Sequence, residues 1–378
     1  MSHHILPLLL GLVMDPVEGV STEGMKALVQ AGDAFLAENA EECAPYCEDT
    51  SSSFLAVPPF LNRPSAGCRA LVGTNLAVML PKILERASDW TSAGRKSAMG
   101  CVQASQVLAE TTMGAHMAAI LHTLTNSAND EEPEVSAMAM TCGQLIGRHC
   151  DTGSLMGLLT PKIAPSVNSQ LSSLVLLNEA IKGMFPGAMC PHLELIGKAL
   201  GNEDLINGHS TVDGKAFAGK SHGAAGEGDV PFFIALAIKA IVENVKDAGL
   251  GAWEAAFFRV LVGVQANSLS RAFYNGDLAA DTLSTDPVAA QSADSMKTLA
   301  EATHPDVQAG SGGGDTSSSS DAMERLFKAN FGVILSDAMK TTKEWEAYSH
   351  HRFVFETVLR MGGHHVGDQV LPLLESFR

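Results

Sequence analysis

The segment AVMLPKILERASD (77–89) recurs farther along the chain as AAILHTLTNSAND (118–130), and the two copies align without a gap. The likeness continues beyond them, through AMGCVQ (98–103) in the first copy and AMTCGQ (139–144) in the second. An earlier stretch, ILPLLLGLVMDP (5–16), also aligns with the first copy and shares two leucines, a proline and an aspartate with it. Repetition at a fixed interval predicts a stack of similar units rather than one globular core.

Each unit has the pattern of two helices joined by a polar turn. The second half of one unit carries an apolar stripe at the spacing of a single helical face, made of Val135, Met138, Ala139, Cys142, Leu145 and Ile146. Units of about 40–47 residues built from two helices are typical of HEAT and armadillo repeats, in which each pair buries its apolar face against its neighbours. The sequence therefore predicts an all-α fold, a HEAT-type α-solenoid formed by a superhelical stack of antiparallel helix pairs.

The turn inside each unit carries an aspartate, which is Asp89 in one copy and Asp130 in the next. An aspartate there can cap the following helix by accepting hydrogen bonds from its free N–H groups. Arg95 stands at the start of a second helix, where many HEAT units place an arginine near the capping aspartate of a neighbouring unit. We interpret Arg95 and these aspartates as a structural ladder rather than as a functional site.

The chain is long for one core, but a solenoid needs no division into domains. Helix pairs are predicted at about 3–39, 73–112, 114–149, 152–185, 189–247, 250–303 and 320–362, followed by a lone helix from about Gly367. We predict a single array over 1–378, with flexible insertions at 41–64, 201–229 and 304–320, because these stretches are rich in Gly, Ser, Pro or acidic residues. The last helix, VLPLLESF (370–377), lacks a second helix to cover it, so we expect a longer array.

Composition limits the classes of partner. The 378 residues carry a formal net charge of −17 and are 46% hydrophobic, which supports a fully folded chain. Nucleic acids and anionic membranes select Lys- and Arg-rich surfaces, so neither is expected as a partner. Nine carboxylates lie between Asp15 and Asp49 beside a single lysine, Lys26. We interpret this stretch as a solvated face, with an acidic docking surface as the alternative.

Cysteine usage and the N-terminus bear on location. The seven cysteines form no paired framework, which suits a reducing compartment. Cys101 and Cys142 occupy the same repeat position on the apolar stripe and are expected in the core. The apolar start of the chain lacks the Lys or Arg and the A-x-A pattern of a signal peptide and aligns with a repeat helix. No apolar run reaches the roughly 18 residues that a transmembrane helix needs.

One sequence motif could carry chemistry. GKAFAGKS (214–221) satisfies the phosphate-binding pattern G-x4-G-K-[ST], with Gly214, Gly219, Lys220 and Ser221 at the defining positions. A working phosphate loop follows a buried strand and opens a helix, whereas polar and Gly-rich sequence lies on both sides here. A nucleotide hydrolase is therefore only a distant alternative.

Other reactive residues are scattered. The six residues Cys43, Cys47, His149, Cys150, Cys190 and His192 lack the spacing of a zinc site. The doublets His350–His351 and His364–His365 could bind a metal or sense pH, but no spaced carboxylate completes a site, and we interpret them as exposed histidines. No nucleophile motif is present. The sequence thus predicts no metal, no cofactor and no enzyme.

The remaining function class is protein binding. The helix KEWEAYSHHRFVFETVLRM (343–361) contains Trp345 and Arg352, residue types enriched in interface hot spots, although packing of Trp345 in the core is the alternative. Polar residues expected to be exposed on second helices complete the candidate surface: Lys26, Gln103, Gln144 and Arg148.

Two stretches carry a family resemblance: RPSAGCRALVGTNLAVMLPKILERASDWTSAGRKSA (63–98) and DEEPEVSAMAMTCGQLIG (130–147). They resemble the C-terminal half of the HEAT-repeat axonemal dynein assembly factor, the fifth of that series. In that family a Pro-containing Gly-Cys-Arg segment leads into a helix, an Asp-Trp turn and a second helix containing Arg-Lys. The matching positions here are Arg63, Pro64, Gly67, Cys68, Arg69, Asp89, Trp90, Arg95 and Lys96.

The resemblance implies a cytoplasmic, non-enzymatic scaffold for preassembly of axonemal dynein arms, required for ciliary or flagellar motility. Its implied partners are axonemal dynein chains, chaperones or other assembly factors. From the residues alone, the expectation extends only to a solenoid that binds protein along a concave face. A karyopherin-type transport receptor and a phosphatase-scaffold-like HEAT protein remain the alternatives.

Overall fold

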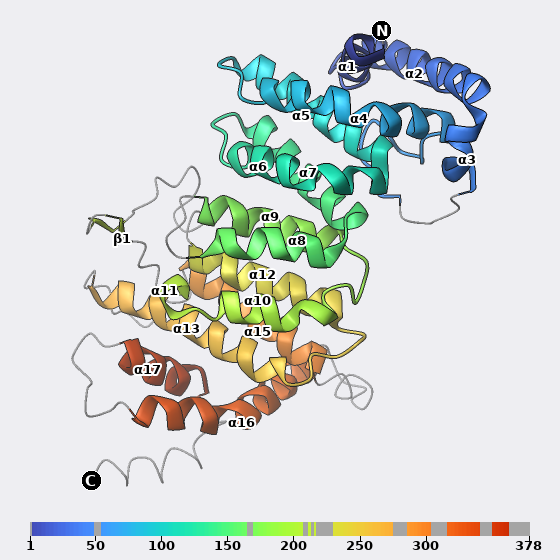
Figure 1. Cartoon of the computed structure of the whole chain (residues 1–378). Helices are drawn as coiled ribbons and strands as arrows, with labels where there is room; N and C mark the ends of the chain where they lie inside the picture. The colour runs from blue at the N-terminus through green and yellow to red at the C-terminus, as the bar shows by residue number, and fades with distance from the viewer. Residues whose placement is uncertain are drawn as a thin grey trace, which may run out of the picture. The chain divides into compact units, whose positions relative to one another are not determined.

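The computed structural model describes residues 2–48, 54–164, 169–206, 211–212, 215–216, 230–274, 286–303, 316–340 and 350–362. Helices dominate this part of the chain (Figure 1). In the N-terminal part they are α1 (Ser2–Val13), α2 (Glu18–Glu38), α3 (Ala40–Glu48), α4 (Ala66–Arg86), α5 (Ser92–Ala109), the 3-10 helix η1 (Glu110–His116), α6 (Met117–Ser127), α7 (Pro133–His149), α8 (Thr152–Leu159) and η2 (Thr160–Ile163). The predicted all-α solenoid class is confirmed.

The later elements continue the pattern of helix pairs. They are α9 (Gln170–Gly183), η3 (Cys190–His192), α10 (Leu193–Leu200), α11 (Glu203–Ile206), α12 (Val230–Val245), α13 (Trp253–Tyr274), α15 (Pro287–Thr303), α16 (Thr316–Lys340) and α17 (His350–Gly362). Among the described residues, sheet is limited to the antiparallel hairpin of β1 (Thr211–Val212) and β2 (Lys215–Ala216), in the register Thr211↔Ala216 and Val212↔Lys215.

The chain divides into two compact units. Unit 1 comprises Met1–Pro161 and Val175–Phe185, and unit 2 comprises Lys162–Leu174 and Pro186–Arg378. Each has its own apolar core of Leu, Ile, Val, Met, Ala and Phe side chains. The single array over 1–378 remains a prediction.

The three sequence copies share one turn geometry in unit 1. In each, the aspartate carboxylate accepts the backbone N–H two residues later, at Asp15 to Val17, Asp89 to Thr91 and Asp130 to Glu132, with distances of 2.8, 2.8 and 2.9 Å. The aspartate thus closes the turn, while the helix cap is a different residue. Thr91 caps α5 by accepting the Gly94 N–H at 3.1 Å. The capping role predicted for Asp89 therefore belongs to Thr91.

The predicted ladder joins successive repeats within unit 1. Arg95 at the start of α5 donates from Nε and Nη2 to the two carboxylate oxygens of Asp130, at 2.7 and 2.9 Å. The same guanidinium donates to the backbone carbonyls of Asp89 and Trp90 in its own turn. The Arg95–Asp130 ladder is confirmed, and it fixes the α4–α5 turn against the α6–α7 turn.

Small residues let helices of unit 1 approach closely. A Cβ on Gly147 of α7 would overlap the Ala180 carbonyl oxygen of α9, and a Cβ on Gly183 of α9 would overlap the Gln144 carbonyl oxygen of α7. The two contacts are reciprocal, so the crossing of α7 and α9 requires glycine, with only hydrogen in place of a side chain, at both positions.

Cys101 and Cys142 are buried as predicted, and burial raises the pKa of the Cys101 thiol to about 11.

Aromatic packing supports unit 2. Phe258 of α13 and Phe327 of α16 are buried edge-to-face, with ring centroids 5.0 Å apart. Farther along α13, Ala266 and Leu269 enclose Phe353 of α17. Helix α17 packs mainly on α13, whereas α16 packs mainly on α15.

The segment 41–64, predicted as a flexible insertion, is partly helical. Helix α3 covers Ala40–Glu48, and its Cys43 is fully buried. After residues outside the described ranges, Val57 and Phe60 form an isolated antiparallel bridge and are both buried. Burial of these apolar side chains orders a stretch whose polar composition suggested a loop. Most of 201–229 and 304–320 lies outside the described residues.

None of the described helices combines the length and the apolar character needed to cross a membrane.

Candidate protein-binding surfaces

Lys26 lies on an exposed face of α2, as expected. Its ammonium pairs with Glu23 at 2.7 Å, and both side chains are more than half exposed. Beside it, Met25 and Val29 help line a groove of about 320 Å³ that runs between α2 and residues 59–65. Leu61, which is 70% exposed, stands at its edge. An apolar groove beside a charged pair can hold an apolar side chain of a partner.

Gln103 does not have the exposure that was predicted. It is only 5% exposed, and its amide Nε2 donates to the Pro58 carbonyl at 3.1 Å. Residues 54–65, which we name the covering loop, lie against α5 at this point. The prediction of an exposed residue is wrong because the helical pattern does not show that a distant part of the chain covers this side of α5.

Gln144 and Arg148 lie one turn apart on α7 and are half-buried. Gln144 donates to Glu179 on α9 at 2.7 Å. Arg148 stacks over the Phe185 ring, with 4.4 Å from its guanidinium carbon to the ring centroid. Phe185 is 43% exposed, so this pair offers a cationic and an aromatic surface to a partner.

A buried charge cluster anchors the covering loop. Arg63 forms a two-point pair with Glu110, at 2.8 Å from Nε and 2.6 Å from Nη2, and Arg69 reaches the same carboxylate at 3.1 Å. The Arg69 and Glu110 side chains are each only 6% exposed. Glu110 ends α5 with a φ of 46°, a left-handed conformation that is uncommon for a residue with a side chain. We name Arg63, Arg69 and Glu110 the loop clamp.

Sequence reasoning identified Arg63 and Arg69 only as resemblance positions and missed Glu110. No local pattern points to that carboxylate, because it lies 47 positions after Arg63 in the chain.

His149 is buried nearby, and burial is the main reason that its pKa falls to about 4. The Glu110 carboxylate opposes this fall, while Arg148 and Arg63 add to it.

Several sequence candidates belong to unit 2. Trp345, the doublet His364–His365 and the four defining positions of the phosphate-loop motif, Gly214, Gly219, Lys220 and Ser221, lie outside the described residues. Arg352 is half-buried on α17, next to His351. The structure therefore keeps Arg352 as a partly accessible residue and leaves the role of Trp345 untested.

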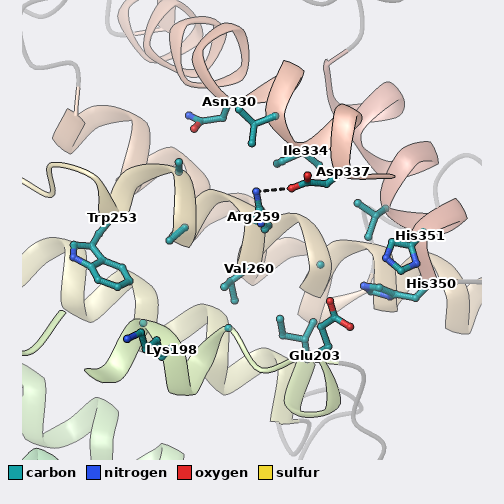
Figure 2. A pocket seen from close by; sticks show the side chains of 18 residues that line it. Lys198, Glu203, Trp253, Arg259, Val260, Asn330, Ile334, Asp337, His350 and His351 are labelled. Carbon is teal, nitrogen blue, oxygen red and sulfur yellow. Dashed lines mark ion pairs between the residues drawn. The ribbon is translucent and has the colours of Figure 1, made fainter. Parts of the chain in front are cut away.

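Unit 2 contains a cleft of about 750 Å³ over α13, shown in Figure 2. Its floor includes Val260 and the neighbouring small residue Gly263 of α13. Lys198 and Glu203 lie on one side, and residues of α16 lie on the other. His350 and His351 of α17 close one end, opposite Trp253 (Figure 2).

The charged groups around this cleft are largely paired. Arg259 and Asp337 face each other across it at 2.8 Å (Figure 2). A hydrogen bond from Lys340, supported by Arg259, holds the pKa of the Asp337 carboxyl below its usual range. Lys198 pairs with Glu194 along α10 at 2.5 Å. The described lining thus has the character of an apolar cleft with a balanced rim, suited to contact with a protein segment.

Comparison with known proteins shows which protein family this chain resembles. Residues 56–215 match the family model of the HEAT-repeat domain of dynein axonemal assembly factor 5. The chain resembles that assembly factor, as its sequence predicts. The loop clamp and the Arg95–Asp130 ladder both lie inside the matched residues, whereas most of the cleft in unit 2 lies beyond them.

Three relatives carry the same name, dynein axonemal assembly factor 5. The mouse protein is 24% identical over 379 residues, covering 100% of this chain and 38% of the relative. The human protein is 28% identical over 200 residues, covering 52% of this chain and 23% of its own length. The Xenopus laevis protein is 26% identical over 216 residues, with 56% and 25% covered. This chain therefore matches well under half the length of these relatives.

Proposed function

We propose that this chain is a non-enzymatic scaffold that acts in cytoplasmic preassembly of axonemal dynein arms, and thereby in ciliary or flagellar motility. The observation that carries the proposal is the match of residues 56–215 to the HEAT-repeat domain of dynein axonemal assembly factor 5. The names of the three relatives agree with it. We expect the partners to be axonemal dynein chains, chaperones or other assembly factors.

The binding surface that we propose lies on the second helices of unit 1. Lys26 on α2 supplies an exposed cation and Phe185 an exposed ring, while Arg148, stacked on that ring, and Gln144 contribute half-buried polar groups. Gln103 is removed from the proposed surface because the covering loop lies over it. Stacked helix pairs offer a long surface of this kind to a large client.

Affinity capture from cytoplasm before ciliogenesis tests this function. The unaltered chain should recover axonemal dynein chains, and the double variant Lys26→Glu, Arg148→Ala should recover at least about tenfold less. Lys297→Glu is the matched control, since it reverses an exposed cation in unit 2 that lies outside the cleft lining, and it should leave recovery unchanged. Circular dichroism and thermal melting should be the same for all variants.

The outcome also separates the rival functions. Recovery of Ran and nuclear cargo without dynein chains would establish a transport receptor instead. Recovery of a phosphatase catalytic subunit would establish a phosphatase scaffold. If dynein chains are captured equally by the double variant, the assembly role stands and the proposed surface is wrong.

A further inference from the structure

Trp90 occupies the turn between α4 and α5 and is 92% exposed. No other large apolar side chain in the described ranges with stated burial is as exposed. Tryptophan has a large apolar surface that contributes strongly when it is buried at an interface, and it is one of the residue types enriched in binding hot spots. An exposed indole on a folded domain is therefore available as an anchor for a partner.

The backbone under this indole is held in place by hydrogen bonds. The Asp89 carboxylate accepts from both the N–H and the hydroxyl of Thr91, each at 2.8 Å, and Thr91 in turn accepts the Gly94 N–H. Arg95 donates to the carbonyls of Asp89 and Trp90 at 3.2 and 3.3 Å. The turn is therefore ordered before a partner binds, so little conformational entropy of the turn is lost on binding.

Arg95 also joins this turn to the α6–α7 turn through Asp130, and its hydrogen bond lowers the pKa of the Asp130 carboxyl. That second turn continues with Glu131, whose side chain is 85% exposed, and with Glu132. The geometry places the indole and these carboxylates on two adjacent, cross-linked turns.

The charge around Trp90 favours a cationic partner. Arg95 is occupied by Asp130, and Lys96 pairs with Glu134. Arg86 is exposed and acts on the Asp89 carboxyl, yet this edge still carries five carboxylates, Asp89, Asp130, Glu131, Glu132 and Glu134, against the three cations Arg86, Arg95 and Lys96. Glu131 lies 3.5 Å from Arg95, which already holds Asp130, so acidic charge remains in excess on the exposed side. The formal net charge of −17 acts in the same direction.

We propose that Trp90, with Glu131 and Glu132, forms a docking point for a Lys- or Arg-rich segment of a partner protein. A lysine or arginine of the segment lies over the indole face in a cation–π contact, while its neighbours pair with the two glutamates. This site is on the turn edge of unit 1 and does not depend on the identity of the client proposed above.

The test uses the full chain labelled with 5-fluorotryptophan. Its three tryptophans give separate fluorine resonances, which Trp90→Phe, Trp253→Phe and Trp345→Phe assign. The probe is an amphipathic synthetic peptide with lysine at every polar position, and the comparison peptide has glutamate there. We expect the lysine peptide to shift the Trp90 resonance selectively, with an affinity that falls as salt is raised.

Variants separate the contribution of the indole ring from that of the two glutamates. Trp90→Ala should weaken binding at least about tenfold, with Trp90→Phe retaining part of the affinity because phenylalanine still offers a ring face. Glu131→Gln with Glu132→Gln should weaken binding and reduce its salt dependence. Leu195→Ala is the control, since it removes another exposed apolar side chain, in unit 2, and should have no effect.

Three results would overturn the proposal. Equal binding of the glutamate peptide would show apolar contact without charge selection. Unchanged affinity in Trp90→Ala would place the site elsewhere. A Trp90 shift on raising protein concentration alone, or on adding neutral lipid vesicles, with no shift from the lysine peptide, would assign the indole to self-association or to a membrane.

Discussion

The α4–α7 region of unit 1 and the α13–α17 region of unit 2 use different contacts to hold helix pairs together. In α4–α7 the polar links are charged and mostly buried: Arg95 reaches Asp130 in the next repeat, and the loop clamp joins the covering loop and α4 to Glu110 at the end of α5. In α13–α17 the buried links are uncharged: Phe258 packs on Phe327, and Gln265 and Ser292 donate hydrogen bonds between α13 and α15, while the Arg259–Asp337 ion pair is about half exposed. Directional contacts specify the register of a repeat, whereas apolar packing mainly supplies stability.

The largest expected effect comes from the loop clamp. Glu110→Ala removes the carboxylate shared by Arg63 and Arg69, and breaking a buried pair by deleting one partner costs about 3–5 kcal/mol. Urea unfolding should show this loss, and hydrogen exchange should rise first in residues 54–65. Glu110→Gln is the matched control and should lose less. An effect under about 1 kcal/mol would mean that the cluster behaves like an exposed pair.

The next effect is a loss of stability in acid that originates in unit 1. His149 has a pKa of about 4 in the folded chain and about 6.5 when unfolded, so the unfolded state binds the extra proton between these values. Its contribution to stability is therefore present above about pH 6.5 and is lost as the pH falls towards 4, by up to about 3 kcal/mol. His149→Leu should flatten this part of the curve when unfolding is measured across that window. Parallel curves for both proteins would contradict the prediction.

A smaller effect is expected at the α7–α9 crossing. Gly147→Ala places a methyl group against the Ala180 carbonyl, and overpacking of this kind costs about 1–3 kcal/mol. Thermal unfolding measures the change. Gly157→Ala is the matched control, because a Cβ at that helical position meets no atom within 4 Å. Equal melting temperatures for the two variants would show that the crossing adapts without cost.

The smallest effect should come from the cleft of unit 2. Arg259→Ala removes a pair that is about half exposed on both sides, so its loss should cost less than about 1 kcal/mol. Chemical denaturation of this variant beside Glu110→Ala gives the contrast between the two regions directly. A loss as large as that of Glu110→Ala would remove the distinction between them.

Much of the fold could be predicted from the repeat. The aspartates at matching positions make matching turns, and Arg95 meets Asp130 because stacking brings the turns of successive repeats side by side. The helix pairs follow from apolar spacing, although the helix at 40–48 was missed because its composition is acidic.

The candidate surface was less predictable. Helical periodicity separates the two faces of a helix but does not show which other segment covers a face, so Gln103 was expected to be exposed. The clamp around Glu110 depends on the same loop. The exposure of Trp90 could not be deduced either, because a turn residue has no periodic pattern that reports its burial.

The hydrogen bond from Gln103 to the Pro58 carbonyl holds the covering loop over one side of α5. Because this loop already covers α5, a client that binds along this side of unit 1 cannot contact that helix here. On the surface proposed above, its footprint would be divided into a part on α2 around Lys26 and a part on α7 around Arg148. A client segment that bridges these two parts needs a spacer that passes over the covering loop, and the length of that spacer is set by this protein rather than by the client.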